Sequence, residues 1–231
     1  MTFAFEPAPR PVIAVEDGGE FPVRRIFCIG RNYADHVREM GGDPKADPPV
    51  FFSKPADSVV ASGATIAYPQ ATSDFHHEGE LVIALKSGGR NLSAAAAQEA
   101  IFGFAAGCDL TRRDLQAAAK KAGAPWDASK GFDQSAPIAP ILRREAAGAL
   151  LDKGRLKLSV NGEMRQDAPL STMIWSAPEI LMELSKLFEL KAGDLVFTGT
   201  PAGVGPLRAG DRVTVEISAL PTLQFSIGAS I

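Results

Sequence analysis

Two glutamates spaced two positions apart are the side chains of this sequence most suited to chemistry. Glu78 and Glu80 directly precede the apolar run Leu81–Ile83. We expect a strand there, and the two-residue period of a strand places both carboxylates on one face. Anions so close repel each other unless a cation lies between them. Oxygen ligands without cysteine favour a hard divalent cation, Mg²⁺ or Mn²⁺.

Two other interpretations of this segment stay open at the level of sequence. A solvated strand edge that carries two glutamates without a function is the commoner explanation of the pair taken alone. Zinc binding through His76 or His77 is the second alternative, but the sequence offers no convincing third nitrogen or sulfur ligand.

Asp109 is a candidate for a third oxygen ligand. It follows the apolar run Ala105–Cys108, where a lone carboxylate is unfavourable unless it is paired or bound to a metal. The alternative is structural, because aspartate is a common helix N-cap and a short helix is expected from Asp114 to Lys121, ending at Gly123. The residues themselves do not decide between the two.

A histidine and a glutamate three positions apart could form a general base. His36 and Glu39 share one face if Asn32 to Met40 is helical, and a carboxylate beside an imidazole raises its basicity and orients it. The glycines and prolines that follow, up to Pro49, suit a segment that orders over a ligand. A surface His–Glu pair is the commoner explanation of such spacing.

The glycine-rich segment Thr198–Pro206 follows an expected strand. Its glycines allow close backbone approach and unusual φ angles. It lacks the pattern of a phosphate-binding P-loop or of a dinucleotide-binding turn. It is either a tight structural turn or a loop whose amides and Thr200 hydroxyl hold a carboxylate.

Short strands separated by turns should position these side chains. The 231-residue chain contains 22 glycines, its composition is that of an ordinary globular protein, and its net charge of -3 argues against nucleic acid or membrane partners. The Asn161-Gly162 pair predicts a hairpin, and Pro178 to Phe188 an amphipathic helix. We expect a β-rich α+β fold, with residues 1–22 as an arm or small hairpin and residues 23–231 as one catalytic domain. The first residues carry no secretory signal pattern, which favours a cytoplasmic location.

Five motifs in a fixed order resemble the fumarylacetoacetate hydrolase family over roughly residues 24–228. Any one of them is weakly specific, but the ordered set is highly specific, and the first resembles the acylpyruvase or fumarylpyruvate hydrolase branch. The motifs are Gly30-Arg31-Asn32-Tyr33, His77-Glu78-Gly79-Glu80-Leu81, Asp109-Leu110-Thr111-Arg112-Arg113-Asp114, Ser129-Lys130-Gly131-Phe132-Asp133 and Thr198-Gly199-Thr200-Pro201-Ala202-Gly203-Val204-Gly205.

The resemblance implies a rolled mixed β-sheet, a homodimer and a set of site residues. It implies Mg²⁺ or Mn²⁺ bound by Glu78, Glu80 and Asp109. It also implies that His36 and Glu39 activate water and that Lys130 is a catalytic cation. The substrate site would be lined by Arg113, Gln116, Thr200 and Tyr33.

The implied activity is metal-dependent hydrolysis of the C–C bond in an acylpyruvate such as fumarylpyruvate, a small anionic 2-oxo acid. Such an acid presents a carboxylate and an adjacent keto oxygen, which together suit an octahedral ion held by only three protein carboxylates. Related members of the family decarboxylate or isomerise dicarboxylic acids such as oxaloacetate. A non-catalytic metal-bound binder of small acids is the remaining alternative.

Overall fold

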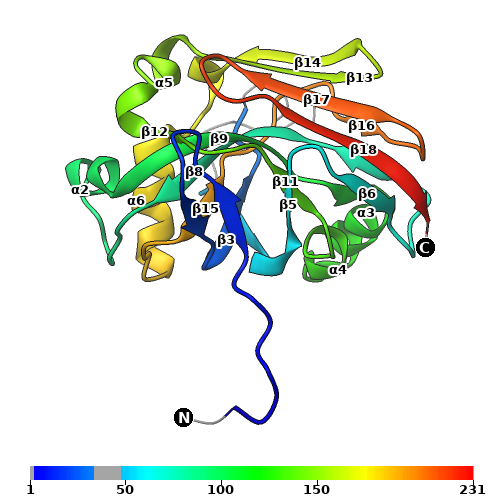
Figure 1. Cartoon of the computed structure of the whole chain (residues 1–231), viewed down its shortest axis with the longest axis horizontal. Helices are drawn as coiled ribbons and strands as arrows, with labels where there is room; N and C mark the ends of the chain where they lie inside the picture. Colours follow the sequence, from blue (N-terminus) through cyan, green and yellow to red (C-terminus); the bar gives the residue numbers. More distant parts are fainter. Residues whose placement is uncertain (1–2, 34–47, 231) are drawn as a thin grey trace.

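Strands dominate the protein, as expected for a β-rich α+β chain. The computed structural model describes residues 3–33 and 48–230. Within these ranges the strands form four sheets, and the largest curls into a half-barrel (Figure 1). A search of the described helices finds none with the length and apolar character that a membrane-spanning segment needs.

The carboxylates predicted to bind a metal lie at one end of the central strands of the largest sheet. Its order is β4-β3-β15-β8-β9-β11-β5, with β12 beside β9. It is mixed, because β3 runs parallel to β15 and β5 parallel to β11, while the remaining neighbours are antiparallel. The bounds are β3 Arg25–Gly30, β4 Val50–Lys54, β5 Val59–Ala61, β8 Gly79–Leu85, β9 Ile101–Cys108, β11 Ala136–Ile138, β12 Leu142–Arg143 and β15 Asp194–Phe197.

A second sheet of five strands and two small ribbons complete the described β structure. The second sheet has the order β14-β13-β17-β18-β6, and the ribbons are β10-β7-β16 and β1-β2. The bounds are β1 Val12–Ala14, β2 Glu20–Pro22, β6 Thr65–Tyr68, β7 Phe75–His77, β10 Thr111–Arg112, β13 Arg155–Val160, β14 Glu163–Pro169, β16 Gly205–Pro206, β17 Arg212–Ile217 and β18 Leu223–Ser230. The described α-helices are α2 Ala94–Ala100, α3 Arg113–Ala122, α4 Asp127–Lys130, α5 Leu150–Lys153 and α6 Ala177–Leu187.

The core lies on both faces of the largest sheet. All seven residues of β8 are buried. After Glu80 the strand is a continuous apolar run, as expected for a strand that is covered on both faces. Leu81 and Ile83 belong to one cluster, which fills the space toward the second sheet and the packed pair α2 and α6. Val82 and Ala84 belong to the other cluster, which the β1–β2 hairpin covers. Strands β8 and β9 are therefore held rigidly from two sides.

The turns and helix ends that the sequence predicts are present in the structure. Asn161 and Gly162 have φ angles of 53° and 81° between β13 and β14, as the hairpin prediction requires. Helix α3 ends at Gly123, which adopts a left-handed φ of 65°. Ser93 caps α2, and its hydroxyl accepts a hydrogen bond from the Ala96 N–H at 3.3 Å.

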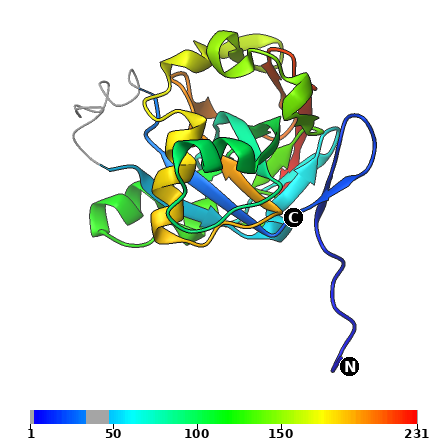
Figure 2. The ribbon, with the colours of Figure 1, turned by 90° about the vertical axis from the view of Figure 1, so that its left-hand side faces the viewer.

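The N-terminal part of the chain stands apart from the body. Strands β1 and β2 form a hairpin against the largest sheet, and the described residues before it, from Phe3 on, project away as an extended arm (Figure 2). Phe3 and Phe5 on this arm are exposed. The division of the chain at residue 22 into an arm and a catalytic domain stays a prediction.

Candidate active site

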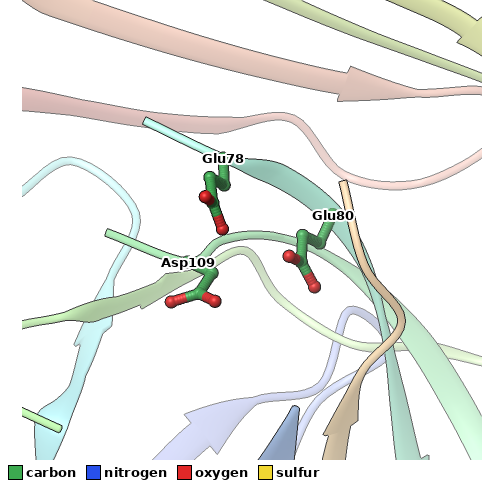
Figure 3. Close-up of side chains that lie close together, drawn as sticks. All are labelled: Glu78, Glu80 and Asp109. Atoms are coloured by element: carbon green, nitrogen blue, oxygen red, sulfur yellow. The ribbon is translucent and has the colours of Figure 1, made fainter. Parts of the chain in front are cut away.

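Three carboxylates converge where strands β8 and β9 meet the ribbon β7. Glu78 lies between β7 and β8, Glu80 is the second residue of β8, and Asp109 directly follows β9. The antiparallel register pairs Gly79 with Cys108, and the Asp109 N–H donates to the Glu78 carbonyl at 2.8 Å. One ligand oxygen from each side chain lies within 4.8 Å of the others, and the carboxylates point toward a common space (Figure 3).

The structural alternatives considered for these residues do not hold. Glu78 is 6% exposed, Glu80 2% and Asp109 0%, so the pair does not lie on a solvated strand edge. Asp109 is not a helix cap either, because α3 begins at Arg113 and Arg112 is its N-cap residue. The zinc alternative also lacks support, since the candidate metal cluster found among the described residues holds these three carboxylates and no histidine.

Lys130 joins two of the three carboxylates. Its ammonium nitrogen lies 2.6 Å from Glu78 Oε2, 2.7 Å from Asp109 Oδ2 and 2.7 Å from Thr111 Oγ1, so each of its three N–H bonds has an acceptor. Burial alone would lower the pKa of Lys130, but the charges of Asp109 and Glu78 outweigh it and raise that pKa. Lys130 is therefore a fixed positive charge inside the centre.

Two further cations balance the centre. Lys54 at the end of β4 is buried, and its nitrogen lies 2.8 Å from Asp109 Oδ1. Arg113 at the start of α3 donates to Glu78 Oε1 at 2.5 Å. Burial would raise the pKa of Glu78, but Lys130 and Arg113 more than offset it and lower that pKa to about 2.

Glu80 differs from the other two carboxylates because no described residue forms an ion pair with it. Its Oε2 accepts a hydrogen bond from the Gly199 backbone N–H at 2.8 Å. Burial, followed by the charges of Asp109 and Glu78, raises the pKa of Glu80 well above its ordinary value. Its buried oxygens thus lack a cation to offset their charge.

The glycine-rich loop therefore holds a carboxylate of the protein itself through the Gly199 amide. Thr200, the next residue, donates its hydroxyl hydrogen to the Gly79 carbonyl at 2.9 Å. The same hydroxyl accepts from Gln166 Nε2 at 2.8 Å. The loop is thus a tight turn that orients Glu80, and the predicted binding of a carboxylate by the Thr200 hydroxyl stays a prediction.

A cavity of about 40 Å³ opens beside the carboxylates. Seven of the side chains predicted from the sequence, Thr200 among them, line this cavity. They come from β8 and the residue before it, the residue after β9, the helices α3 and α4, and the loop after β15. The lining residues are Ile29, Gly30, Arg31, Phe52, Glu78, Glu80, Asp109, Arg113, Gln116, Lys120, Trp126, Lys130 and Thr200.

Tyr33 is not among these lining residues. It is 2% exposed, and its hydroxyl has no hydrogen-bond partner within residues 3–33 and 48–230. Burial, followed by the charge of Glu80, raises the pKa of Tyr33. Its predicted role in substrate binding stays a prediction, and so do the roles of Arg113, Gln116 and Thr200.

The predicted general base lies outside the described residues. His36 and Glu39, with most of the helix expected to carry them, fall between the two described ranges. Asn32, near the end of the first described range, is wholly buried. Its side-chain amide donates to the Thr198 carbonyl at 2.7 Å. The end of β3 is thereby fastened to the loop that orients Glu80.

Sequence reasoning missed two residues that support the centre. Lys54 ends a short strand without any local sign of a partner, and its contact with Asp109 joins positions far apart in the chain. Gln166 sits in β14, where its Oε1 accepts from the Gly79 N–H at 2.9 Å and its Nε2 donates to Thr200. Gln166 thus fixes the residue between the two glutamates, and only the pairing of distant strands reveals it.

The donor set fits a hard divalent cation. Three buried carboxylates offer oxygen ligands only, which is the set that Mg²⁺ and Mn²⁺ prefer. Asp109 Oδ1 forms an ion pair with Lys54 but accepts no hydrogen bond from the described residues. Glu80 has no cationic partner among the described residues. Both observations indicate oxygens that are available to a metal ion.

Comparison with known proteins identifies the family. Residues 25–227 match the family described as fumarylacetoacetate (FAA) hydrolase C-terminal, which is most of the chain. The chain belongs to the fumarylacetoacetate hydrolase family. The resemblance and the rolled mixed sheet that it implied are both confirmed.

Within the fumarylacetoacetate hydrolase family, relatives with two activities are about equally similar. The crystal structure of fumarylpyruvate hydrolase from Pseudomonas aeruginosa, in complex with Mn²⁺ and pyruvate, matches with a TM-score of 0.95 at 43% identity, covering 99% of this chain and 100% of that chain. A fumarylpyruvate hydrolase from Ralstonia sp is 38% identical, covering 80% of this chain and 96% of the relative. A mitochondrial oxaloacetate tautomerase from Bos taurus is 39% identical, covering 88% and 91%.

Proposed function

We propose that this chain is a metal-dependent hydrolase that cleaves the C–C bond of an acylpyruvate, such as fumarylpyruvate, to pyruvate and a carboxylic acid. The observation that carries the proposal is the cluster of Glu78, Glu80 and Asp109 beside a small cavity. The likeness to a fumarylpyruvate hydrolase crystallised with Mn²⁺ and pyruvate supports it, because pyruvate is the product that the reaction would leave at the metal.

The charges of the centre favour an anionic 2-oxo acid. The three carboxylates are formally balanced by Lys54, Lys130 and Arg113. A divalent cation held by the carboxylates would then leave two positive charges uncompensated in a buried site. The carboxylate of a 2-oxo acid offsets one of them, and the negative charge that develops on an enolate offsets the other.

The side chains that line the cavity beside the carboxylates suggest their roles in this reaction. Glu78, Glu80 and Asp109 would hold Mg²⁺ or Mn²⁺, which supplies positive charge that polarises the 2-oxo acid. Arg113 binds Gln116 Oε1 at 2.6 Å, which leaves the amide N–H bonds of Gln116 to donate to the substrate. Lys130 stabilises negative charge through its field, since its own N–H bonds are already accepted by the protein.

The reaction also needs a base, and the sequence suggests His36 oriented by Glu39. His36 takes a proton from water, and the resulting hydroxide adds to the carbonyl carbon of the acyl group. The bond between that carbon and the methylene carbon of the pyruvate unit then breaks. Its electron pair becomes the pyruvate enolate, which takes up a proton to give pyruvate.

Oxaloacetate tautomerisation or decarboxylation is the second candidate function. The similarity to curated oxaloacetate tautomerases is as high as the similarity to the fumarylpyruvate hydrolases. Both chemistries need the same metal-bound 2-oxo acid end, so the carboxylate cluster does not separate them. A non-catalytic binder of small acids would have the same metal site but no turnover.

Steady-state assays on three substrates separate these functions. Fumarylpyruvate, acetylpyruvate and oxaloacetate should each be tested with Mn²⁺, with Mg²⁺ and with a chelator. We expect metal-dependent release of pyruvate and a carboxylic acid from the acylpyruvates, faster than any change in oxaloacetate. Turnover of oxaloacetate alone would establish the second candidate. No turnover of any substrate, with Mn²⁺ bound, would contradict both enzymes.

Two variants test the predicted catalytic residues. We expect His36→Ala to lower kcat by about 100- to 10,000-fold, the usual effect of losing a general base. Its affinity for oxalate, which needs the metal but no base, should stay within about twofold. Equal losses of rate and oxalate affinity would point to a structural role. Lys121→Met, a change at an exposed lysine of α3, is the matched control for Lys130→Met, which should abolish turnover.

The homodimer and the cytoplasmic location expected from the sequence stay predictions. Sedimentation of the purified chain would test the first, and localisation of a tagged chain in its own cell would test the second.

A further inference from the structure

The cavity beside the carboxylates continues into a larger groove on the same side of the protein. The inner cavity measures about 40 Å³ and the groove about 620 Å³. The four residues that line both are Arg31, Phe52, Lys120 and Trp126. Sites for small molecules usually span about 300–1,000 Å³, so the inner cavity cannot hold a whole acylpyruvate. A substrate whose 2-oxo acid end lies at the carboxylates must extend its acyl end past these four residues.

We propose that Lys120 and Arg31 form a distal subsite that binds a second carboxylate, at the far end of the acyl group. This inference rests on the proposed function and narrows its substrate class to dicarboxylic acylpyruvates. The subsite would distinguish an acyl group that ends in a carboxylate from one that ends in a methyl group.

Helix α3 links the carboxylate centre to this subsite. Arg113, Gln116 and Lys120 are spaced by three and four residues, so they form one stripe along the helix. All three line the inner cavity, and Lys120 also lines the groove. Lys121, the next residue, is exposed and lines neither of the two spaces.

The two cations of the subsite have no acidic partner within the part of the chain that the structure describes. Among the described residues, neither Lys120 nor Arg31 forms an ion pair, whereas Lys54, Lys130 and Arg113 each contact a carboxylate. Lys120 is exposed at the groove, yet the protein atoms around it, followed by the charge of Arg113, lower its pKa. An anion placed between Lys120 and Arg31 would offset this repulsion.

The backbone and the aromatic rings of the subsite suit an unsaturated acyl chain. Arg31 has a left-handed φ of 61°, a strained conformation for a residue other than glycine, and such strain is concentrated at functional sites. The Lys120 nitrogen lies 5.1 Å from the centre of the Trp126 ring. The Phe52 and Trp126 rings are 5.6 Å apart, so flat apolar walls lie beside the two cations.

Binding of two uncleavable acids of equal length tests the subsite. 2-Oxoheptanedioate and 2-oxoheptanoate share a 2-oxo acid end and differ in the distal carboxylate, and neither has the second keto group that cleavage needs. Calorimetric titrations with Mn²⁺ present and at low salt, where an exposed charge pair is least screened, should show tighter binding of the diacid by the parent chain. We expect a preference of about tenfold, as for one charge-assisted hydrogen bond.

Three variants at neighbouring positions decide whether Lys120 carries this preference. Lys120→Met should remove most of the preference and leave the affinity for the monoacid within about twofold. Lys120→Arg should retain the preference, and Lys121→Met should match the parent. An unchanged preference in Lys120→Met, or no preference in the parent, would overturn the proposal. The titrations need no turnover, so a diacid preference in a chain that cleaves no acylpyruvate would refute the proposed reaction and leave the subsite standing.

Discussion

Two buried carboxylates lie at opposite ends of strand β15, and they are held very differently. Asp194 begins the strand and is 0% exposed. Arg24 donates to its two oxygens at 2.9 and 3.1 Å, and the Lys191 N–H donates to Oδ2 at 2.8 Å. Glu80 lies beside the loop that follows the strand, and the Gly199 amide is its one hydrogen-bond donor among the described residues.

The difference separates a carboxylate that supports the fold from one that is suited to bind a ligand. The Asp194 charge is matched within the protein, so the strand end is complete without any additional ion. None of the described residues supplies a cation to Glu80, so its ionised form is unfavourable until an external cation matches the charge. Burial alone does not distinguish the two residues, but the presence or absence of a partner does.

The largest effect should come from removing the Glu80 charge. Glu80→Gln keeps the acceptor for the Gly199 amide but loses an anionic ligand. We expect the affinity for Mn²⁺ to fall by more than the roughly 10- to 100-fold that the loss of an outer-shell partner causes. Calorimetric titration with Mn²⁺ measures this, and metal-dependent turnover should disappear with it. Parent-like Mn²⁺ affinity in the variant would show that Glu80 is not a ligand.

Removing the charge of Asp194, at the start of β15, should lower stability and leave the affinity for Mn²⁺ unchanged. Asp194→Asn leaves Arg24 without its charge partner, so the free energy of unfolding should fall by about 2 kcal/mol and Tm by roughly 4–8 °C. The partial exposure of Arg24 keeps this effect below that of a fully buried pair. Thermal unfolding followed by circular dichroism measures the loss. The folded variant should still bind Mn²⁺ as the parent does, and a joint loss of both properties would erase the distinction between the two ends.

Two glycines with similar backbone conformations test whether the loop after β15 supports metal binding through Glu80. Gly199 and Gly210 have φ angles of 91° and 95°, so alanine strains both backbones, by about 1–3 kcal/mol each. A Cβ at Gly199 would lie 2.8 Å from the Asn32 Cβ, whereas one at Gly210 would meet nothing within 4 Å. Gly199→Ala should therefore also weaken Mn²⁺ binding, by about tenfold, because the Glu80 donor shifts. Gly210→Ala is the control, and equal Mn²⁺ affinities in the two variants would contradict this.

The smallest effect concerns the metal-free protein and its dependence on pH. The raised pKa of Glu80 means that the folded state holds a proton there which the unfolded chain releases at lower pH. The stability of the metal-free protein should therefore decrease as pH rises above the unfolded value of about 4.3 and through the folded pKa. Glu80→Gln should remove this decrease and raise Tm by roughly 2–4 °C at neutral pH. The gain should vanish near pH 4, and a metal-free variant that is less stable than the parent at pH 7 would contradict the argument.

The sequence predicted the parts of the site that depend on local rules. The two-residue spacing of Glu78 and Glu80 predicted that their side chains lie together. They do, although Glu78 directly precedes β8 and only Glu80 lies within it. The turn at Asn161 and the end of α3 at Gly123 follow from backbone conformations that few residues adopt.

The remaining parts needed tertiary pairing. Asp109 reaches the glutamates because Gly79 pairs with Cys108, a register that periodicity alone does not set. Lys54 and Gln166 gave no local signal, since each acts on a residue more than 50 positions away. Strands of two or three residues, such as β10 and β7, are defined by their partners and not by their own propensity.

The bridging position of Lys130 has a consequence for the rate at which the site fills. Its ammonium group holds Glu78 Oε2 and Asp109 Oδ2, oxygens on two of the residues that an arriving ion would need. If the ion binds the three carboxylates as proposed, its uptake would require a Glu78 oxygen to be released, because Lys130 holds Oε2 and Arg113 holds Oε1. This release would add to the loss of water from the ion. Association should be slower than diffusion, with a rate that saturates as the concentration of Mn²⁺ increases.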